Sequence, residues 1–155
     1  MKRTHHCNEL RLEHTGQEVT LSGWVHSCRD LGGVIFIDIR DREGRTQVVF
    51  DPQDSDPTLV DIVSKLHSES VISVSGRVRQ RPDETENVKI STGQVEIVAM
   101  AMEVYNHSDV LPFQIDDPDA AAKVNEELRL QYRYLDLRRP EMARNLRLRS
   151  KVATA

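Results

Sequence analysis

The stretch of residues 34–50 constrains the fold of this chain more than any other part of its sequence. Isoleucine occupies every second position from 35 to 39, which is the period-2 pattern of a half-buried strand. A charged turn follows at residues 41–45, in which Gly44 is free to take a positive φ. Alternation resumes over residues 46–50, so the stretch predicts a β-hairpin.

Two side chains of this hairpin suggest a binding surface. If the hairpin closes near Gly44, Phe36 and Gln47 lie on one sheet face as near neighbours. An exposed ring offers a stacking platform for an unstacked base, and a nearby amide can both donate to and accept from a base edge. The alternative is that Phe36 is a core residue and Gln47 a solvated one. Spacing alone leaves both interpretations open.

Three further strands and one helix are predicted around this hairpin. The strands are expected at 18–26, 70–79 and 95–105. Apolar residues at helical spacing predict a short helix at 59–66. Gly23 marks a bend or bulge in the first strand, and the Gly-rich segment 29–33 is expected to turn into the second strand. The order predicts a mainly β fold, a five-stranded OB-fold Greek-key barrel with a short helix between strands 3 and 4, whose second and third strands commonly face oligonucleotides.

The composition changes after the last predicted strand and divides the chain into three predicted regions. Residues 1–107 form the barrel, and residues 108–140 form a linker or hinge that contains the acidic run 116–119. Residues 141–155 are a truncated helical segment, the start of another domain. Pro140 suits the first turn of its helix, and no stop signal follows. We therefore expect this helix to belong to a domain that continues beyond the chain.

Charge is distributed unevenly along the chain, whose net charge is −4. Residues 1–107 hold 12 Lys and Arg against 17 Asp and Glu, whereas residues 128–155 hold 8 against 2. Cations of the first region cluster near predicted loops, so a local basic groove could form on an acidic domain. A charge-balanced, solvated surface remains the alternative.

Targeting signals and metal motifs are not evident in the sequence. It has no run of 18 apolar residues and no apolar signal segment, so we expect a cytoplasmic protein without a membrane span. Cys7 and Cys28 have neither metal-like nor redox spacing, which predicts reduced thiols. A zinc site with His5, His6 and His26 is imaginable, but without a paired C-x-x-C motif we expect no metal site.

The chain carries three longer motifs: GQEVTLSGWVHSCRDLGGVIFIDIRDREGRTQVVFDP at 16–52, STGQVEI at 91–97 and YRYLDLRRPEM at 132–142. In this order they resemble the N-terminal part of bacterial aspartyl-tRNA synthetases, class II enzymes with an anticodon-binding OB-fold ahead of the catalytic domain. The last motif resembles the hinge leading into the first class II motif. The resemblance runs along nearly all 155 residues.

The resemblance implies that the chain binds the anticodon of tRNA(Asp). Phe36 matches the aromatic that stacks on the central uracil, and Gln47 matches the glutamine that hydrogen-bonds that base. Arg29 matches an arginine that contacts the anticodon. Glu96 matches an acidic residue near the first anticodon base, suited to accept from a guanine edge.

The loop after the fourth predicted strand and the tip of the first hairpin add further positions. Arg79 and Arg81 match basic positions that lead into the loop closing over the anticodon, and Asn87 is a predicted contact within that unusually acidic loop. Leu31 lies where some members that serve both tRNA(Asp) and tRNA(Asn) carry histidine, which leans toward tRNA(Asp) alone.

Full-length enzymes of this kind join aspartate to ATP as aspartyl-adenylate, with Mg²⁺, and transfer it to tRNA. The second and third class II motifs, which build the ATP site, do not occur in these 155 residues. The resemblance therefore implies neither a catalytic residue nor a cofactor in this chain. It also implies a homodimeric parent and a monomeric state for this chain alone.

Four alternatives remain at this point. The parent could serve both tRNA(Asp) and tRNA(Asn), or it could be an asparaginyl or lysyl sibling, although the motifs fit the aspartyl group better. A general single-strand-binding OB module would bind any RNA or single-stranded DNA about equally, whereas an anticodon reader discriminates at the central base. A protein-interaction domain would bind no RNA.

Overall fold

The computed structural model describes residues 1–115 and 123–154. It divides into two compact units, Met1–Val110 and Leu111–Ala155. The predicted acidic run at 116–119 lies outside the described residues. Within the described residues, no helix is both long and apolar enough to cross a membrane.

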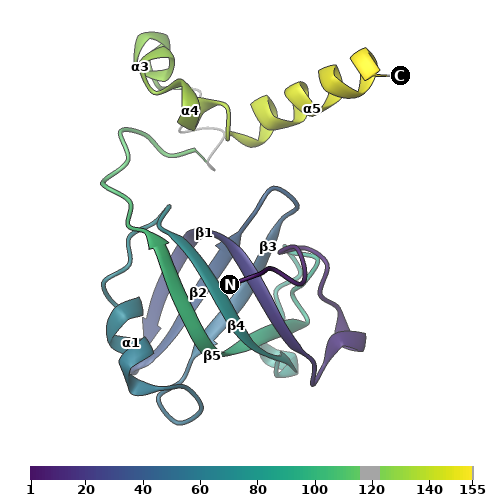
Figure 1. Cartoon of the computed structure of the whole chain (residues 1–155), viewed down its shortest axis with the longest axis vertical. Coiled ribbons are helices and arrows are strands. Elements are labelled where there is room, and N and C mark those ends of the chain that lie inside the picture. Colours follow the sequence, from purple (N-terminus) through teal and green to yellow (C-terminus); the bar gives the residue numbers. More distant parts are fainter. Residues whose placement is uncertain (116–122, 155) are drawn as a thin grey trace. The chain divides into compact units, whose positions relative to one another are not determined.

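The first unit is a closed five-stranded barrel (Figure 1). Its strands are β1 (Glu18–Leu31), β2 (Val34–Arg40), β3 (Arg45–Phe50), β4 (Val71–Gln80) and β5 (Val95–Asn106), and helix α1 (Pro57–Val63) lies between β3 and β4. Short 3-10 turns are present at Leu12–His14 and Asp83–Thr85. The strands follow the order β1-β2-β3-β5-β4 round the barrel, and the parallel β3–β5 pair completes the closure. The predicted OB-fold is confirmed.

Strand β1 serves two neighbours because it bends near Gly23. Its first half pairs with β4 as far as Trp24, and its second half pairs with β2 from Trp24 onward. A Cβ atom at Gly23 would lie 2.3 Å from the carbonyl oxygen of Arg40. A bend or bulge is predicted at this glycine; the change of partner follows at Trp24, and the register irregularity lies between Val25 and Ser27. The close approach of β2 explains why no side chain fits at Gly23.

The turn between β1 and β2 is shorter than the sequence suggested. Residues 29–33 were expected to form it, yet β1 continues to Leu31 and only Gly32 and Gly33 remain outside both strands. Their φ angles are 67° and 93°, and two successive positive φ angles allow a two-residue hairpin turn. Arg29 is therefore a strand residue, paired with Phe36.

The hydrophobic core fills the barrel. Ile35, Ile37 and Ile39 point inward as their alternation predicted, and each is at most 2% exposed. Two segments add to this core: Cys7 and Leu10 of the N-terminal segment, and Leu59, Val63 and Leu66 in and after α1. The side chains that alternate with these core residues along the strands face outward and form the outer surface of the barrel.

A buried carboxylate fixes the N-terminal segment to the β2–β3 turn. Asp41 accepts hydrogen bonds from the backbone N–H groups of Glu43 and Cys7, at 2.8 and 3.1 Å, and lies 2.7 Å from Nδ1 of His6. Burial acts to raise the pKa of Asp41, but these hydrogen bonds outweigh it and hold that pKa below the ordinary value. The charged form of Asp41 therefore stabilises the fold.

In the described part of the second unit lie helices α3 (Glu126–Gln131), α4 (Arg133–Asp136) and α5 (Pro140–Thr154). Phe113, Ile115 and Leu135 form its small apolar cluster. Helix α5 begins at Pro140, as predicted.

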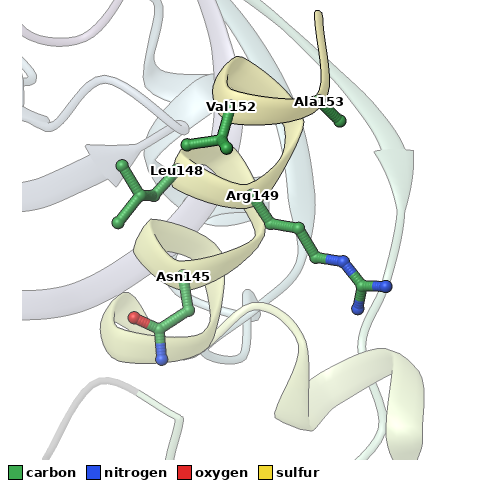
Figure 2. A pocket seen from close by; sticks show the side chains of 5 residues that line it. All are labelled: Asn145, Leu148, Arg149, Val152 and Ala153. Atoms are coloured by element: carbon green, nitrogen blue, oxygen red, sulfur yellow. The ribbon is translucent and has the colours of Figure 1, made fainter.

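Helix α5 has an exposed apolar face. Leu148 and Val152 lie along the helix, 61% and 73% exposed. With Asn145, Arg149 and Ala153 they line a shallow pocket on the helix (Figure 2).

The bend of β1 gives the first prediction. Gly23→Ala should lower the free energy of unfolding by about 1–3 kcal/mol, because the added methyl group meets a backbone oxygen that cannot move away cheaply. Urea denaturation would measure this loss. Ser22→Ala is the matched control, since it removes only the hydrogen bond to Ser73 on the outer side of the barrel; equal losses for both variants would contradict the role given to Gly23.

The buried carboxylate gives the second prediction. Because the pKa of Asp41 is lowered by folding, its contribution is present above the ordinary carboxyl pKa and is lost as pH falls through the lowered value. Asp41→Asn should therefore lower the free energy of unfolding at pH 7 by about 1–3 kcal/mol, and by progressively less as the pH falls below the ordinary carboxyl pKa, for example at pH 3. Urea denaturation at both pH values tests this. The exposed Asp61→Asn is the control, and a loss for Asp41→Asn that is independent of pH would refute the argument.

Candidate nucleic-acid interface

Phe36 lies on the outer face of the barrel. It faces away from the core isoleucines of β2 and pairs with Arg29 of β1 on one side and Val49 of β3 on the other. Its side chain is half-buried, whereas Val49 is 1% exposed. Phe36 is therefore outside the barrel core, in contrast to the core alternative, and part of its ring surface is accessible.

Gln47 shares this face with Phe36 but is buried. It pairs with Asp38 in the β2–β3 register, so Phe36 and Gln47 are diagonal neighbours and not directly opposed. Gln47 is 7% exposed, which differs from the solvated alternative. Both ends of its amide are engaged: Nη2 of Arg29 donates to Oε1 at 3.2 Å, and Nε2 donates to Oε2 of Glu96 at 2.9 Å.

Glu96 is a buried carboxylate that joins three strands. It is 3% exposed and lies opposite Arg79 in the β4–β5 register. Nε and Nη2 of Arg79 donate to Oε1 of Glu96 at 3.1 and 2.7 Å. Oε2 accepts from Gln47 of β3, so each oxygen of this carboxylate has its own donor.

Five side chains form a continuous polar belt across all five strands of the barrel. From β1 to β4 its members are Arg29, Asp38, Gln47, Glu96 and Arg79. Nη2 of Arg29 lies 3.5 Å from Oδ1 of Asp38, which joins the first two members.

The polar belt is layered by charge. The arginine side chains are the exposed members, 51% for Arg29 and 45% for Arg79, whereas those of Asp38 and Glu96 are 15% and 4% exposed. Within the belt, the cations therefore face the solvent while the carboxylates lie beneath them. Outside the belt, Nη1 of Arg79 also lies 3.5 Å from Oδ2 of the exposed Asp54. The layering of the belt explains how an acidic protein can offer a locally positive surface to an anion.

Arg81 lies beneath the surface. It is 3% exposed; its Nε donates to the carbonyl oxygen of Val95 at 3.1 Å, and its Nη1 donates to that of Thr85 at 3.4 Å. Burial lowers the pKa of Arg81, partly offset by Glu96, whose Oε2 lies 4.0 Å from Nε. Its Nη2 is buried and makes no hydrogen bond within the described residues. In this state Arg81 supports the 81–94 loop and does not reach the solvent.

The two remaining predicted positions lie at loop and hairpin edges. Asn87 is half-buried, and its Oδ1 accepts from the backbone N–H of Lys89 at 3.0 Å, which shapes the 81–94 loop. Leu31 is 65% exposed at the end of β1, opposite Val34. Neither residue belongs to the polar belt.

Asp38 is a member of the site that the sequence did not predict. Alternation in β2 places it on the face of Phe36, but only the register shows that it lies opposite Gln47 and next to Ser27, whose Oγ donates to Oδ2 at 3.1 Å. Metal ligands were not expected, and the described residues contain no group of three or more His, Cys, Asp or Glu side chains that could hold a metal ion. Cys7 is a buried thiol and Cys28 an exposed one.

The arrangement suits an unstacked base. Phe36 supplies a ring for stacking, the nearby amide of Gln47 is held in place for hydrogen bonding, and Arg29 and Arg79 lie where they can meet phosphate. Stacking, edge hydrogen bonding and a cationic rim are the usual components of single-strand recognition on an OB-fold.

Comparison with known proteins agrees with this geometry. The aspartate–tRNA(Asp/Asn) ligase of Opitutus terrae is 50% identical over 153 residues, which are 99% of this chain and 25% of the relative. The chain thus spans about a quarter of that curated relative's length. Asparaginyl-tRNA synthetase from Pyrococcus horikoshii, solved with asparaginyl-adenylate, is 25% identical with a TM-score of 0.81, covering 99% of this chain and 33% of that one.

An aspartyl-tRNA synthetase structure from Entamoeba histolytica shares the fold, with a TM-score of 0.81 at 24% identity over 96% of this chain and 35% of that one. The tRNA anti-codon family model, described as an OB-fold nucleic acid binding domain, matches residues 19–105. This match covers more than half of the chain, including the whole polar belt, and the protein therefore belongs to the tRNA anti-codon family of OB-fold nucleic acid binding domains.

Proposed function

We propose that this chain recognises the anticodon of tRNA(Asp) as part of an aspartate–tRNA ligase. The proposal rests on two side chains that share one face of the barrel. Phe36 presents a partly accessible ring, and the buried amide of Gln47 lies diagonally from it on the neighbouring strand. The 50% identity to a ligase of this kind supports the same conclusion.

Each member of the site has a proposed role. The central uracil stacks on Phe36 and hydrogen-bonds Gln47, while Arg29 and Arg79 contact the anticodon backbone. Glu96 lies near the first anticodon base. Arg81 and Asn87 take part through the 81–94 loop, which must shift before the buried guanidinium of Arg81 can reach RNA. The binding energy supports catalysis in the parent by positioning the distant acceptor end of the tRNA.

The parent enzyme would be cytoplasmic and homodimeric, and would ligate aspartate to tRNA through aspartyl-adenylate with ATP and Mg²⁺. The family resemblance assigns ATP and Mg²⁺ to the second and third class II motifs, which do not occur in these 155 residues. We further propose that residues 108–140 are a hinge and that residues 141–155 begin the catalytic domain. The exposed apolar residues of α5 are consistent with this division. The isolated chain is expected to be monomeric.

Dual specificity is the second candidate. The relative from Opitutus terrae is named for both tRNA(Asp) and tRNA(Asn), whereas Leu31 favours tRNA(Asp) alone. Stem-loops with the anticodons GUC and GUU differ only at the third base, so their relative affinities separate the two candidates. Equal binding of the two would support a dual-specificity parent.

Stacking on Phe36 gives the third prediction. Phe36→Ala should weaken binding of a GUC anticodon stem-loop by about 1–3 kcal/mol, since one base loses its platform. Fluorescence anisotropy at fixed low salt would measure the change. Phe36→Tyr keeps the ring and should bind within about threefold of the unchanged protein; unchanged binding by Phe36→Ala would exclude a stacking role.

Base reading by Gln47 gives the fourth prediction. The unchanged protein should prefer a GUC stem-loop to one with GCC, and Gln47→Ala should remove most of that preference, because one amide–base contact gives about 1–3 kcal/mol of discrimination. The readout is the ratio of the two dissociation constants. Arg77→Gln, a change of an exposed cation outside the polar belt, should leave the ratio intact.

The preference of the unchanged protein decides between function classes. Equal binding of GUC and GCC would favour a general single-strand-binding module. An absence of binding to either RNA would contradict the proposal that this chain reads the anticodon by itself.

A further inference from the structure

The amide of Gln47 is held at its two ends by partners of opposite character. A guanidinium can only donate hydrogen bonds, and an ionised carboxylate can only accept them. Arg29 donates to Oε1, and Glu96 accepts from Nε2. Rotating the amide by 180° would place its NH₂ group against Arg29 and its oxygen against Glu96, so only one of the two orientations satisfies both partners.

Neither partner is free to adapt to the rotated amide. Asp38 lies 3.5 Å from the same Nη2 atom of Arg29 that meets the amide. Two donors of Arg79 occupy Oε1 of Glu96, which leaves Oε2 for Gln47. At 7% and 3% exposure, Gln47 and Glu96 lie where solvent gives little help to a mismatched pair.

Uracil and cytosine differ in the order of the hydrogen-bond donor and acceptor that they present to such an amide. At positions 3 and 4 of the ring, uracil presents a donor and an acceptor, whereas cytosine presents an acceptor and a donor. An amide that can rotate fits either base, since it exchanges its own donor and acceptor. An amide with a fixed orientation, acting on a base stacked in one position, fits only one of them.

We propose that Arg29 and Glu96 fix the orientation of the Gln47 amide and thereby make the central position select uracil over cytosine. This inference rests on the proposed anticodon-reading function and deepens it. Oε1 of Gln47 keeps a lone pair for the N3–H group of uracil, and Nε2 keeps a hydrogen for O4. Glu96 acts through Gln47 and is a positioning residue for this selection.

Glu96→Gln is the variant that separates positioning from stability. A glutamine at 96 can donate or accept, so the Gln47 amide is released to rotate while the size of residue 96 is kept. The GUC preference, roughly five- to hundredfold for one bidentate contact, should fall to about threefold or less, mainly because the GCC stem-loop binds more tightly. A residue with only a structural role would weaken both RNAs equally and leave the ratio unchanged.

Arg77→Gln is the matched control. It removes an exposed cation outside the polar belt, so it should leave the ratio of the two affinities unchanged. Arg29→Met is a second test, which releases the acceptor end of the amide. Because Arg29 is half exposed, this variant should fold even where Glu96→Gln does not, and its ratio should also fall.

The outcomes distinguish this inference from the proposed function. An unchanged protein that binds GUC and GCC equally overturns both. A clear preference that survives in Glu96→Gln and in Arg29→Met overturns only the fixed amide and leaves anticodon reading in place. A preference lost in both variants and kept in Arg77→Gln is the expected result.

Discussion

The buried carboxylate of Glu96 is the charge around which the outer face of this barrel is arranged. A carboxylate removed from water must be paired and hydrogen-bonded, or it destabilises the fold. Here a guanidinium from β4 and an amide from β3 meet that requirement, and the amide in turn engages Arg29 of β1. One unsolvated charge therefore links the strands that carry the recognition surface and leaves cations as its outermost groups.

The fold could be predicted from local patterns in the sequence. Alternation in β2, helical spacing after β3 and the glycine at the bend of β1 each reflect a constraint contained within a few residues. The burial of Gln47 could not be predicted from the sequence, because β3 has a neighbouring strand on each side only once it pairs with β5, which lies about 50 residues further along the chain. The polar, Gly-rich composition of residues 29–33 resembles a turn, which is why Arg29 was assigned to one; the paired positive φ angles of Gly32 and Gly33 are visible only in the structure.

Resemblance to a family predicts which residue types occupy a site more reliably than it predicts whether their side chains are exposed. Arg79 and Arg81 are two positions apart and looked alike as basic positions before a loop, yet Arg79 reaches the solvent and Arg81 is buried against its own loop. The difference arises from what lies over each side chain: the 81–94 segment folds back over Arg81, and the carbonyl oxygens of Thr85 in that segment and of Val95 in β5 accept hydrogen bonds from its guanidinium. Which of two neighbouring cations meets a ligand thus depends on loop closure, which the sequence leaves undetermined.

The arrangement of the recognition surface depends on the length of the two-residue turn between β1 and β2. Because side chains alternate between the faces of a strand, a one-residue insertion at Gly32 that kept a two-residue turn would shift the pairing of β1 against β2 by one position. Arg29 would then oppose an isoleucine of the core in place of Phe36. Homologues that differ in length here would have to rebuild the surface entirely, whereas the 81–94 loop can vary in length without moving any strand residue.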